Sequence, residues 1–250
     1  MTVRVLAAAT VSLGLALGSG PAWAAPASIA FVGDSMSDGI WGAFFRMTGG
    51  GRCSPGELTL IRDARNGTGL ARPDHFDWTG ELDTLVDKSM PTLVFAVIGL
   101  NDAQDLVMPD KTKFKLGSDA WLTQYQKNVA DFYEHAGKGG APVVIMGLPN
   151  LRDDSAEKHA ELVNGIYHDV AANERDVSVT YIEPWHLTND DGSFASFGKN
   201  LNGQTVQIRA PDGLHFTQAG YDVLAKYLEP SVAKALAAAH VKLSDTCLSS

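Results

Sequence analysis

Short apolar runs alternate with longer amphipathic segments along most of this chain. Five runs have the length and composition of buried or half-buried strands, and they span residues 28–32, 57–63, 92–98, 142–146 and 177–182. Segments with apolar residues at helical spacing follow them, over residues 40–47, 78–88, 118–136, 153–173 and 217–239. This alternation predicts an α/β fold, a three-layer α/β/α sandwich around a five-stranded parallel sheet.

Details of the pattern predict how individual segments pack. In the first helix, Trp41, Phe44 and Phe45 predict an aromatic face turned toward the core. Thr217 is expected to cap the last helix. Residues 185–210 are rich in Gly, Asn, Asp and Ser and lack periodicity, so we expect a long loop or flap there.

The N-terminal segment has a different composition from the rest of the chain. Residues 1–4 carry a positive charge, residues 5–17 are largely apolar, and residues 21–24 end in an A-x-A-like cleavage site. This pattern is typical of a secretory signal peptide. We therefore expect residues 1–24 to be removed and residues 25–250 to form one periplasmic or secreted domain. The apolar run is short for a bilayer span, so no stable membrane insertion is expected after cleavage.

Net charge and cysteine content limit which partners and metal sites are expected for this protein. The formal net charge of -9 argues against nucleic acid, whose phosphates would repel the protein. Cys53 and Cys247 leave two alternatives open, one disulfide in an oxidising compartment or two free thiols. Neither has a histidine or second cysteine at ligand spacing, which argues against a zinc site. We expect no metal or cofactor, and the sequence leaves the oligomeric state open.

Polar motifs follow the ends of the predicted strands, which is where parallel sheets bind their ligands. Gly33-Asp34-Ser35 follows the first strand, and a serine hydroxyl placed there can be a nucleophile if a base removes its proton. His215, just before the last helix, is the strongest candidate for that base. Asp212 lies three residues earlier, a spacing that can bring its carboxylate to Nδ1 and leave the other ring nitrogen to face Ser35. The alternative is that Asp34-Ser35 only caps a helix.

An acyl-transfer site also needs hydrogen-bond donors fixed where negative charge develops on the substrate oxygen. The candidates are the backbone N–H of Ser35, a backbone N–H in the turn Gly67-Thr68-Gly69, and the side-chain amide of Asn101. Glycine allows the backbone to approach the reacting carbonyl closely. Asn101 could instead only cap a turn, and the aspartate after it is expected to be structural.

These motifs, in this order and each at a strand end, resemble the SGNH hydrolase superfamily, also called GDSL esterases. The resemblance covers the chain after the signal peptide, and the segments 68–78 and 212–217 are similar to an exported bacterial branch of that superfamily. It implies a flavodoxin-like fold. Met36 stands where the family name has leucine, at a position expected to pack rather than react. Ser35 does not lie in a G-x-S-x-G motif, which argues against an α/β-hydrolase nucleophile elbow.

The resemblance also implies roles for individual residues. Ser35 would be the nucleophile and a backbone donor to the oxyanion, and His215 would be the general base. Asp212 would orient His215. Asn101 and a turn glycine would complete the oxyanion hole, with Gly69 preferred over the glycine two residues earlier.

The resemblance and the signal peptide together imply an exported serine esterase. O-acetyl groups on a cell-envelope or extracellular polysaccharide are the expected substrate. A polysaccharide O-acetyltransferase with the same triad is one alternative, and a non-catalytic carbohydrate-binding protein is another. His75 and Arg72, which follow the glycine turn, are candidate substrate-binding residues, although Arg72 could instead hold its loop together. Trp185 and Phe194 could stack on sugar rings or anchor the flap.

Overall fold

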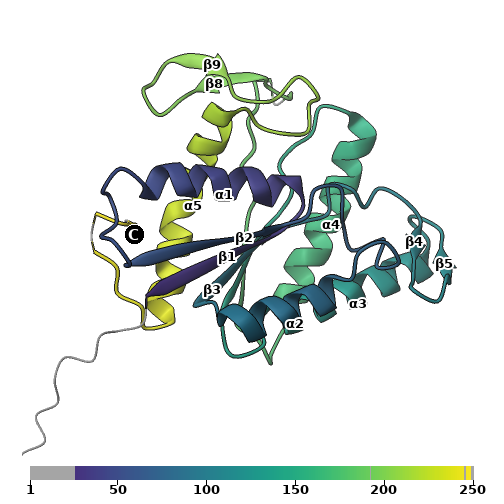
Figure 1. The fold of residues 1–250 in the computed structure, drawn as a ribbon. Helices are drawn as coiled ribbons and strands as arrows, with labels where there is room; N and C mark the ends of the chain where they lie inside the picture. Colours follow the sequence, from purple (N-terminus) through teal and green to yellow (C-terminus); the bar gives the residue numbers. More distant parts are fainter. Residues whose placement is uncertain (1–25, 192, 245, 249–250) are drawn as a thin grey trace, which may run out of the picture.

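The computed structural model describes residues 26–191, 193–244 and 246–248, and the expected signal peptide lies outside this part of the chain. Its central sheet has the strand order β2-β1-β3-β6-β7, with all neighbours parallel (Figure 1). The strands are β1 (Ala27–Gly33), β2 (Leu58–Ala64), β3 (Leu93–Val97), β6 (Val143–Met146) and β7 (Val179–Ile182). Ranked along the chain, this is the order 2-1-3-4-5 of flavodoxin-like folds, so the predicted five-stranded parallel sheet is confirmed.

Helices cover both faces of the sheet, which confirms the three-layer sandwich (Figure 1). On one face, α1 (Ser35–Thr48) packs against α5 (Gln218–Ala238). On the other face lie three neighbouring helices, α2 (Trp78–Ser89), α3 (Asp119–Ala136) and α4 (Asp154–Asn173). Within the described residues, none of the helices combines the length and the apolar character needed to cross a bilayer.

Polar side chains at the helix starts fix where the helices begin. Asp34 Oδ1 accepts a hydrogen bond from the backbone N–H of Met36 at 2.9 Å, so α1 begins at Ser35 rather than at residue 40 as expected. Thr217 accepts from the backbone N–H of Gly220 at 3.2 Å. The predicted cap of the last helix is therefore confirmed.

The inner face of α1 differs from the prediction. Met36, Ile40 and Phe44 recur every fourth residue, and all three are fully buried. Trp41 and Phe45 lie about 100° further round the helix. Phe45 is 61% exposed, and its ring stacks on that of Trp41 with the centroids 5.6 Å apart. The prediction that Phe45 faces the core is wrong, because the other line of apolar residues occupies that side.

Two small antiparallel hairpins lie between the main elements and were not predicted. β4 (Leu106–Val107) pairs with β5 (Lys113–Phe114), and β8 (Phe197–Lys199) pairs with β9 (Thr205–Gln207). The second hairpin lies within the segment expected to be an irregular flap, so that part of the prediction is wrong. Strands of two or three residues contain too few alternations to reveal their period in a sequence.

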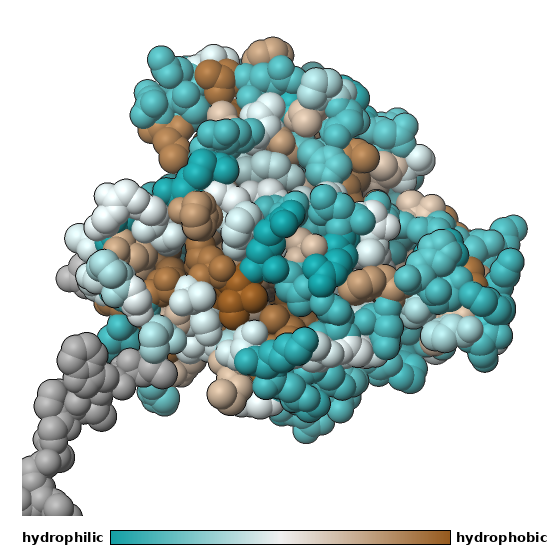
Figure 2. Space-filling view, in the orientation of Figure 1, coloured by the Kyte–Doolittle hydropathy of each residue, from teal (hydrophilic) through white to brown (hydrophobic). Residues whose placement is uncertain are grey.

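Strand β2 forms one edge of the sheet. Its apolar residues Leu58, Leu60 and Ile61 are only half-buried. Figure 2 shows hydrophobic side chains gathered at the surface over β2, below α1. This apolar surface flanks the sheet and is separate from the carboxyl ends of the strands, where the polar motifs lie.

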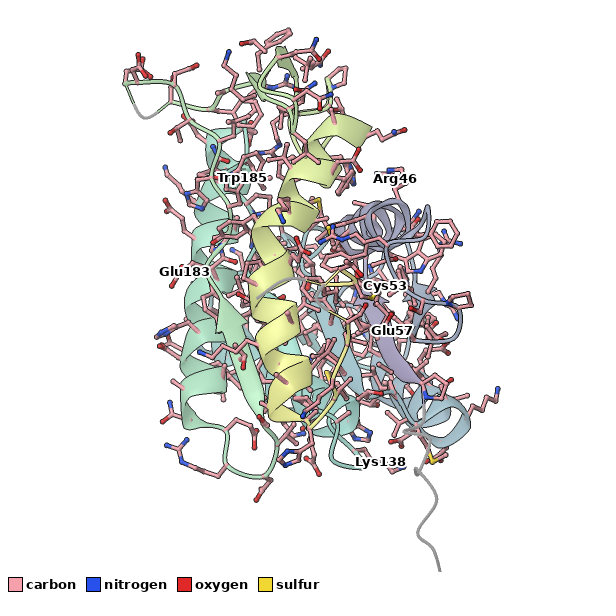
Figure 3. The ribbon with its side chains drawn as sticks, turned by 90° about the vertical axis from the view of Figure 1, so that its left-hand side faces the viewer. Arg46, Cys53, Glu57, Lys138, Glu183 and Trp185 are labelled. Atoms are coloured by element: carbon pink, nitrogen blue, oxygen red, sulfur yellow. A yellow bond between two sulfur atoms is a disulfide. The ribbon has the colours of Figure 1, made fainter. Side chains whose placement is uncertain are left out.

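Cys53 and Cys247 form a disulfide, so the first of the two alternatives for these cysteines is confirmed (Figure 3). The bond ties the C-terminal tail to the loop that follows α1. Arg52 reinforces it, because its Nε donates to the carbonyl of Thr246 at 2.7 Å and its guanidinium contacts the buried Glu229 of α5. The tail is therefore attached both to this loop and, through Arg52, to α5.

Candidate active site

Ser35 stands at the carboxyl end of β1 as the first residue of α1. The preceding Gly33 has a φ of 123°, and a Cβ there would lie 2.0 Å from the carbonyl oxygen of Val97. Only glycine therefore lets β1 approach β3 at this point. The first N–H groups of a helix have no intrahelical acceptor, so Ser35 presents its hydroxyl and its N–H at the positive end of α1.

Asp34 is fully buried and holds the turn that carries Ser35 to the end of β3. One of its oxygens accepts from Met36 N at 2.9 Å and the other from Leu100 N at 3.0 Å. Burial raises its pKa, and these two hydrogen bonds offset the rise only in part, so the pKa is raised to about 7. Asp34 thereby fixes Ser35 relative to the loop that carries Asn101.

The structure brings Ser35, Asp212 and His215 together. Ser35 Oγ lies 2.7 Å from His215 Nε2, and His215 Nδ1 lies 2.8 Å from Asp212 Oδ2. A carboxylate only accepts hydrogen bonds, so Nδ1 carries a proton and Nε2 is left to accept the proton of the serine. This arrangement can deprotonate a serine hydroxyl and stabilise the imidazolium that results.

The turn that carries Asp212 and His215 is held by Asp212 itself. Asp212 Oδ1 accepts from the backbone N–H groups of Leu214 and His215 at 2.8 Å and 3.0 Å. Burial opposes ionisation of this carboxyl, but the hydrogen bonds from the His215 side chain and from the turn outweigh burial. They lower the pKa of Asp212 to about 2, so the group is ionised at neutral pH.

Two predicted oxyanion donors lie on facing loops. Asn101 follows β3, and its Nδ2 donates to the carbonyl of Thr68 at 2.8 Å. An amide has two N–H groups, so one more can be offered to a substrate oxygen. A Cβ at Gly69 would lie 2.0 Å from Asp102 Oδ1, whereas a Cβ at Gly67 would meet nothing within 4 Å. Packing thus requires glycine at position 69, and the oxyanion role of Gly69 stays a prediction.

Asp102 is fully buried and anchors the glycine turn to the body of the protein. It accepts from the backbone N–H groups of Leu70 and Ala71 at 2.8 Å and 2.9 Å, and from Tyr125 Oη at 2.8 Å. Burial raises its pKa despite these hydrogen bonds. Tyr125 Oη lies 2.8 Å from Tyr167 Oη, which donates to a backbone carbonyl just after β3. Sequence reasoning missed both tyrosines, because on amphipathic helices they look like ordinary core residues.

Arg72 and His75 lie in the loop beyond the glycine turn and contact each other. Arg72 Nε donates to Asp74 Oδ1 at 2.8 Å, and its Nη1 donates to Gln104 Oε1 at 3.2 Å. The donors of Arg72 are thus engaged within its own surroundings, whereas the side chain of His75 is 66% exposed. Their roles in substrate binding stay predictions.

The flap aromatics Trp185 and Phe194 make different packing contacts. Trp185 stacks on Phe216 with the ring centroids 5.7 Å apart, and Figure 3 shows it at the same end of the molecule as the flap. The guanidinium of Arg209 lies 4.8 Å from the ring centre of Phe194. Trp185 therefore anchors the flap to Phe216, whereas Phe194 packs on Arg209 near the end of the flap. Sequence reasoning missed Arg209, because a single arginine in an aperiodic segment carries no pattern.

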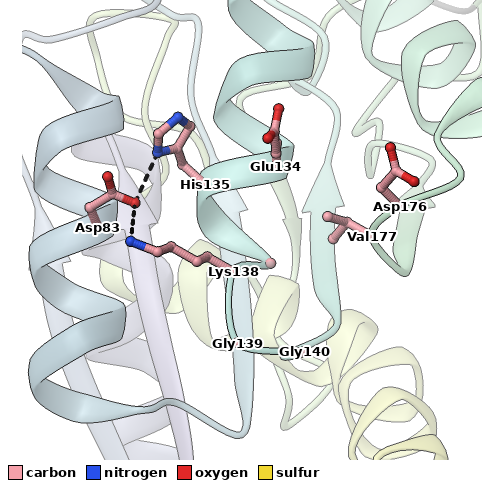
Figure 4. A pocket seen from close by; sticks show the side chains of 9 residues that line it. Asp83, Glu134, His135, Lys138, Gly139, Gly140, Asp176 and Val177 are labelled. Atoms are coloured by element: carbon pink, nitrogen blue, oxygen red, sulfur yellow. Dashed lines mark hydrogen bonds and ion pairs between the residues drawn. The ribbon is translucent and has the colours of Figure 1, made fainter.

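A separate pocket of about 480 Å³ lies near the amino ends of β6 and β7, away from Ser35 (Figure 4). Asp83 Oδ1 lies there 2.9 Å from His135 Nδ1 and 3.1 Å from Lys138 Nζ. Over the described part of the chain, no group of His, Cys, Asp and Glu side chains is arranged to hold a metal ion. This pocket shares no residue with the site around Ser35.

Solved structures with a similar fold include several named as esterases. A carbohydrate esterase family 3 protein from Talaromyces cellulolyticus has a TM-score of 0.57 and 10% identity, over 85% of this chain and 99% of that chain. An acetyl esterase mutant with an acetate ion has the same TM-score of 0.57, 10% identity and coverage of 85% and 99%. A GDSL-like lipase from Bacteroides thetaiotaomicron has a TM-score of 0.54 and 16% identity, over 85% and 92%. At these identities the likeness shows the fold.

A family model described as "Protein of unknown function (DUF459)" matches residues 28–231, which is most of the chain. No curated protein matches. The chain therefore belongs to the DUF459 family, and it has the fold of the SGNH hydrolase, or GDSL esterase, superfamily.

Proposed function

We propose that this protein is an exported serine esterase that removes acyl groups, chiefly O-acetyl groups, from a cell-envelope or extracellular polysaccharide. The observation that carries the proposal is the continuous contact from Ser35 Oγ through His215 to Asp212, at 2.7 Å and 2.8 Å. A general base and the carboxylate that orients it need contacts of this length.

In the first half of the reaction, Ser35 Oγ attacks the carbonyl carbon of the ester while His215 Nε2 takes the hydroxyl proton. Asp212 stabilises the imidazolium that forms. The tetrahedral intermediate then expels the sugar oxygen, which takes the proton from His215 and leaves as an alcohol. The acyl group stays on Ser35 as an ester.

In the second half, His215 removes a proton from water, and the resulting hydroxide oxygen bonds to the acyl carbon. The bond to Ser35 Oγ breaks, and the serine recovers its proton from His215. In both halves, the negative charge on the carbonyl oxygen is stabilised by three donors, the N–H of Ser35, the N–H of Gly69 and an N–H of Asn101.

The exposure of the triad supports a large substrate. The side chains of His215 and Asp212 are 31% and 45% exposed, so an ester attached to a polymer can reach the serine. Among proteins of the same fold, one is named an acetyl esterase and another a carbohydrate esterase. His75 and Arg72 are the proposed contacts to the sugar.

The disulfide supports export. Disulfides persist in oxidising compartments and are rare in the cytosol, and the bond between Cys53 and Cys247 would form after secretion. The signal-peptide pattern of residues 1–24 points the same way. We therefore place the mature protein in the periplasm or outside the cell.

Replacing the nucleophile tests the proposed function. Ser35→Ala is expected to lower kcat on 4-nitrophenyl acetate by at least about 1,000-fold, because the acyl-enzyme can no longer form. The circular-dichroism spectrum should not change. Release of acetate from an acetylated polysaccharide tests the substrate, and transfer of the acetyl group to an added sugar acceptor would indicate an acetyltransferase instead.

Ser37→Ala is a matched control. Ser37 lies one half-turn further along α1, is fully buried, and its hydroxyl makes no hydrogen bond to any described residue. Its loss should leave turnover within about twofold of the wild type, since no partner is left unpaired. A Ser35→Ala variant that retained wild-type turnover would overturn the assignment.

A further inference from the structure

Arg209 is fully buried directly behind the turn that carries His215. Its Nη2 donates to the carbonyl of Leu214 at 2.8 Å, and its Nε donates to the carbonyl of His215 at 3.3 Å. Its Nη1 donates to the carbonyl of Asn150 at 2.6 Å and to Asn150 Oδ1 at 3.2 Å. One guanidinium thus joins the catalytic turn to the loop after β6.

The backbone of Arg209 also joins the turn to the flap. Arg209 N donates to the carbonyl of Ser196 at 3.1 Å, and Arg209 forms an antiparallel bridge with Phe216. The next amide, that of Ala210, donates to the carbonyl of His215 at 2.8 Å. The turn from Ala210 to His215 is therefore closed at its base by Arg209 and its neighbour.

Aromatic rings enclose the guanidinium. It lies 4.3 Å from the ring centre of Phe216 and 4.8 Å from that of Phe194, and Phe216 in turn stacks on Trp185. Two of these rings, those of Phe194 and Trp185, come from the flap. If the flap moved, the contacts between these aromatic rings and the guanidinium of Arg209 would change. The same guanidinium holds the His215 carbonyl.

Arg209 keeps its positive charge in these buried surroundings. Burial lowers its pKa to about 10, which leaves it charged at neutral pH, and Tyr221, Asp212 and Glu157 favour the charged form. Burying a cation costs free energy that an apolar residue of similar size would not cost. A role beyond filling space is therefore expected.

We propose that Arg209 is a positioning residue that holds the His215 imidazole toward Ser35 and couples this orientation to the flap segment that carries Phe194. The kinetic part of this proposal rests on the proposed esterase function. Arg209 acts through the backbone of the catalytic turn and does not touch the reacting atoms.

Three variants of the full mature chain test the proposal. Arg209→Met keeps the length and removes both the charge and the donors, whereas Arg209→Lys keeps the charge and loses the planar fork. Phe194→Leu removes one ring and leaves every hydrogen bond of Arg209 in place. Arg46→Met is the control, because Arg46 is a surface arginine of α1 paired with Asp222 at 2.6 Å.

Arg209→Met is expected to lower kcat on 4-nitrophenyl acetate by about 10- to 100-fold with KM within about twofold, since the base is misplaced while the cleft remains. Arg209→Lys should recover part of the loss. Phe194→Leu should lower kcat by a smaller factor, and Arg46→Met should change neither constant.

Hydrogen exchange gives a readout that does not depend on activity. In Arg209→Met, the backbone amides of residues 210 and 212–217 should exchange at least about tenfold faster while those of β1 and β3 stay protected. If Arg209→Met does not fold, kcat and hydrogen exchange are measured on Arg209→Lys and Phe194→Leu instead. Unchanged kcat and unchanged exchange in folded variants would overturn the proposal. If the wild type itself turned over no ester, the proposed function would fail, and exchange alone would decide whether Arg209 holds the turn.

Discussion

At the scale of single residues, Asp212 makes two kinds of contact beside the carboxyl end of β1, one with an imidazole and one with the backbone. One oxygen contacts His215 Nδ1, and the other accepts two backbone N–H groups of the same turn. The carboxylate therefore orients the imidazole and shapes the backbone that carries it. Because the pKa of Asp212 is lowered to about 2, its titration should not contribute to the pH dependence of the proposed esterase activity above about pH 4.

Asp212→Asn should separate these two functions. The amide oxygen can still accept from the turn, but its NH₂ group would face Nδ1 and favour the wrong tautomer of His215. We expect kcat to fall by about 1,000- to 10,000-fold with little change in thermal stability. Steady-state kinetics at pH 8 and a melting curve measure both quantities, and a fall in kcat of less than tenfold would refute the orienting role.

At the scale of elements, the glycine turn after β2 depends on a loop from the next strand. Asp102 holds this turn through the amides of Leu70 and Ala71, and Asn101 holds it through the carbonyl of Thr68. These two neighbouring side chains, just after β3, fix the position of Gly69 between them. The loop is therefore placed by tertiary contacts rather than by its own sequence.

Gly69→Ala and Gly67→Ala test this dependence as a matched pair. The new Cβ at position 69 would meet Asp102 Oδ1 at 2.0 Å and push the turn away from Ser35. We expect kcat to fall by about 100-fold, the effect of losing one oxyanion donor. Gly67→Ala meets no neighbour within 4 Å but has a φ of 79°, so it should cost about 1 kcal/mol of stability and leave kcat nearly intact. The reverse ranking of the two kcat values would contradict the assignment of Gly69.

For the whole molecule, the disulfide closes almost the entire domain into one loop. Cys53 and Cys247 are separated by 194 residues, so the cross-link restricts the unfolded chain over that length. The bond lies at the end of α1 and the C-terminal tail, away from the carboxyl ends of the strands (Figures 1 and 3). Its contribution is therefore expected to be to stability and not to catalysis.

Replacing both cysteines by serine should lower the free energy of unfolding by about 2 to 5 kcal/mol, because the unfolded chain regains conformational freedom. Urea denaturation of the oxidised protein and of the double variant gives this difference, and kcat at 25 °C should stay within about twofold. The contacts of Arg52 with Thr246 and Glu229 should keep the tail in place. Equal denaturation midpoints for the two proteins would show that the bond does not stabilise the domain.

The sequence alone determined the features that depend on local physics. The period of the apolar residues predicts the strands and helices, Thr217 caps the last helix, and the order of motifs at strand ends points to Ser35, Asp212 and His215. These features were accessible because chain neighbours impose them: a helix needs a cap at its start, and parallel strands align their carboxyl ends.

Only the tertiary structure decided how most distant side chains meet. The sequence predicted that His215 faces Ser35, but the contact of 2.7 Å between these residues, which are 180 positions apart, depends on α5 packing against α1. Local periodicity likewise does not reveal which face of α1 turns inward, how Asp102 reaches Tyr125, or why Arg209 is buried between Phe194 and Phe216. The physical reason is that such contacts depend on how all elements pack together in a close-packed interior. No single segment of the chain contains that information.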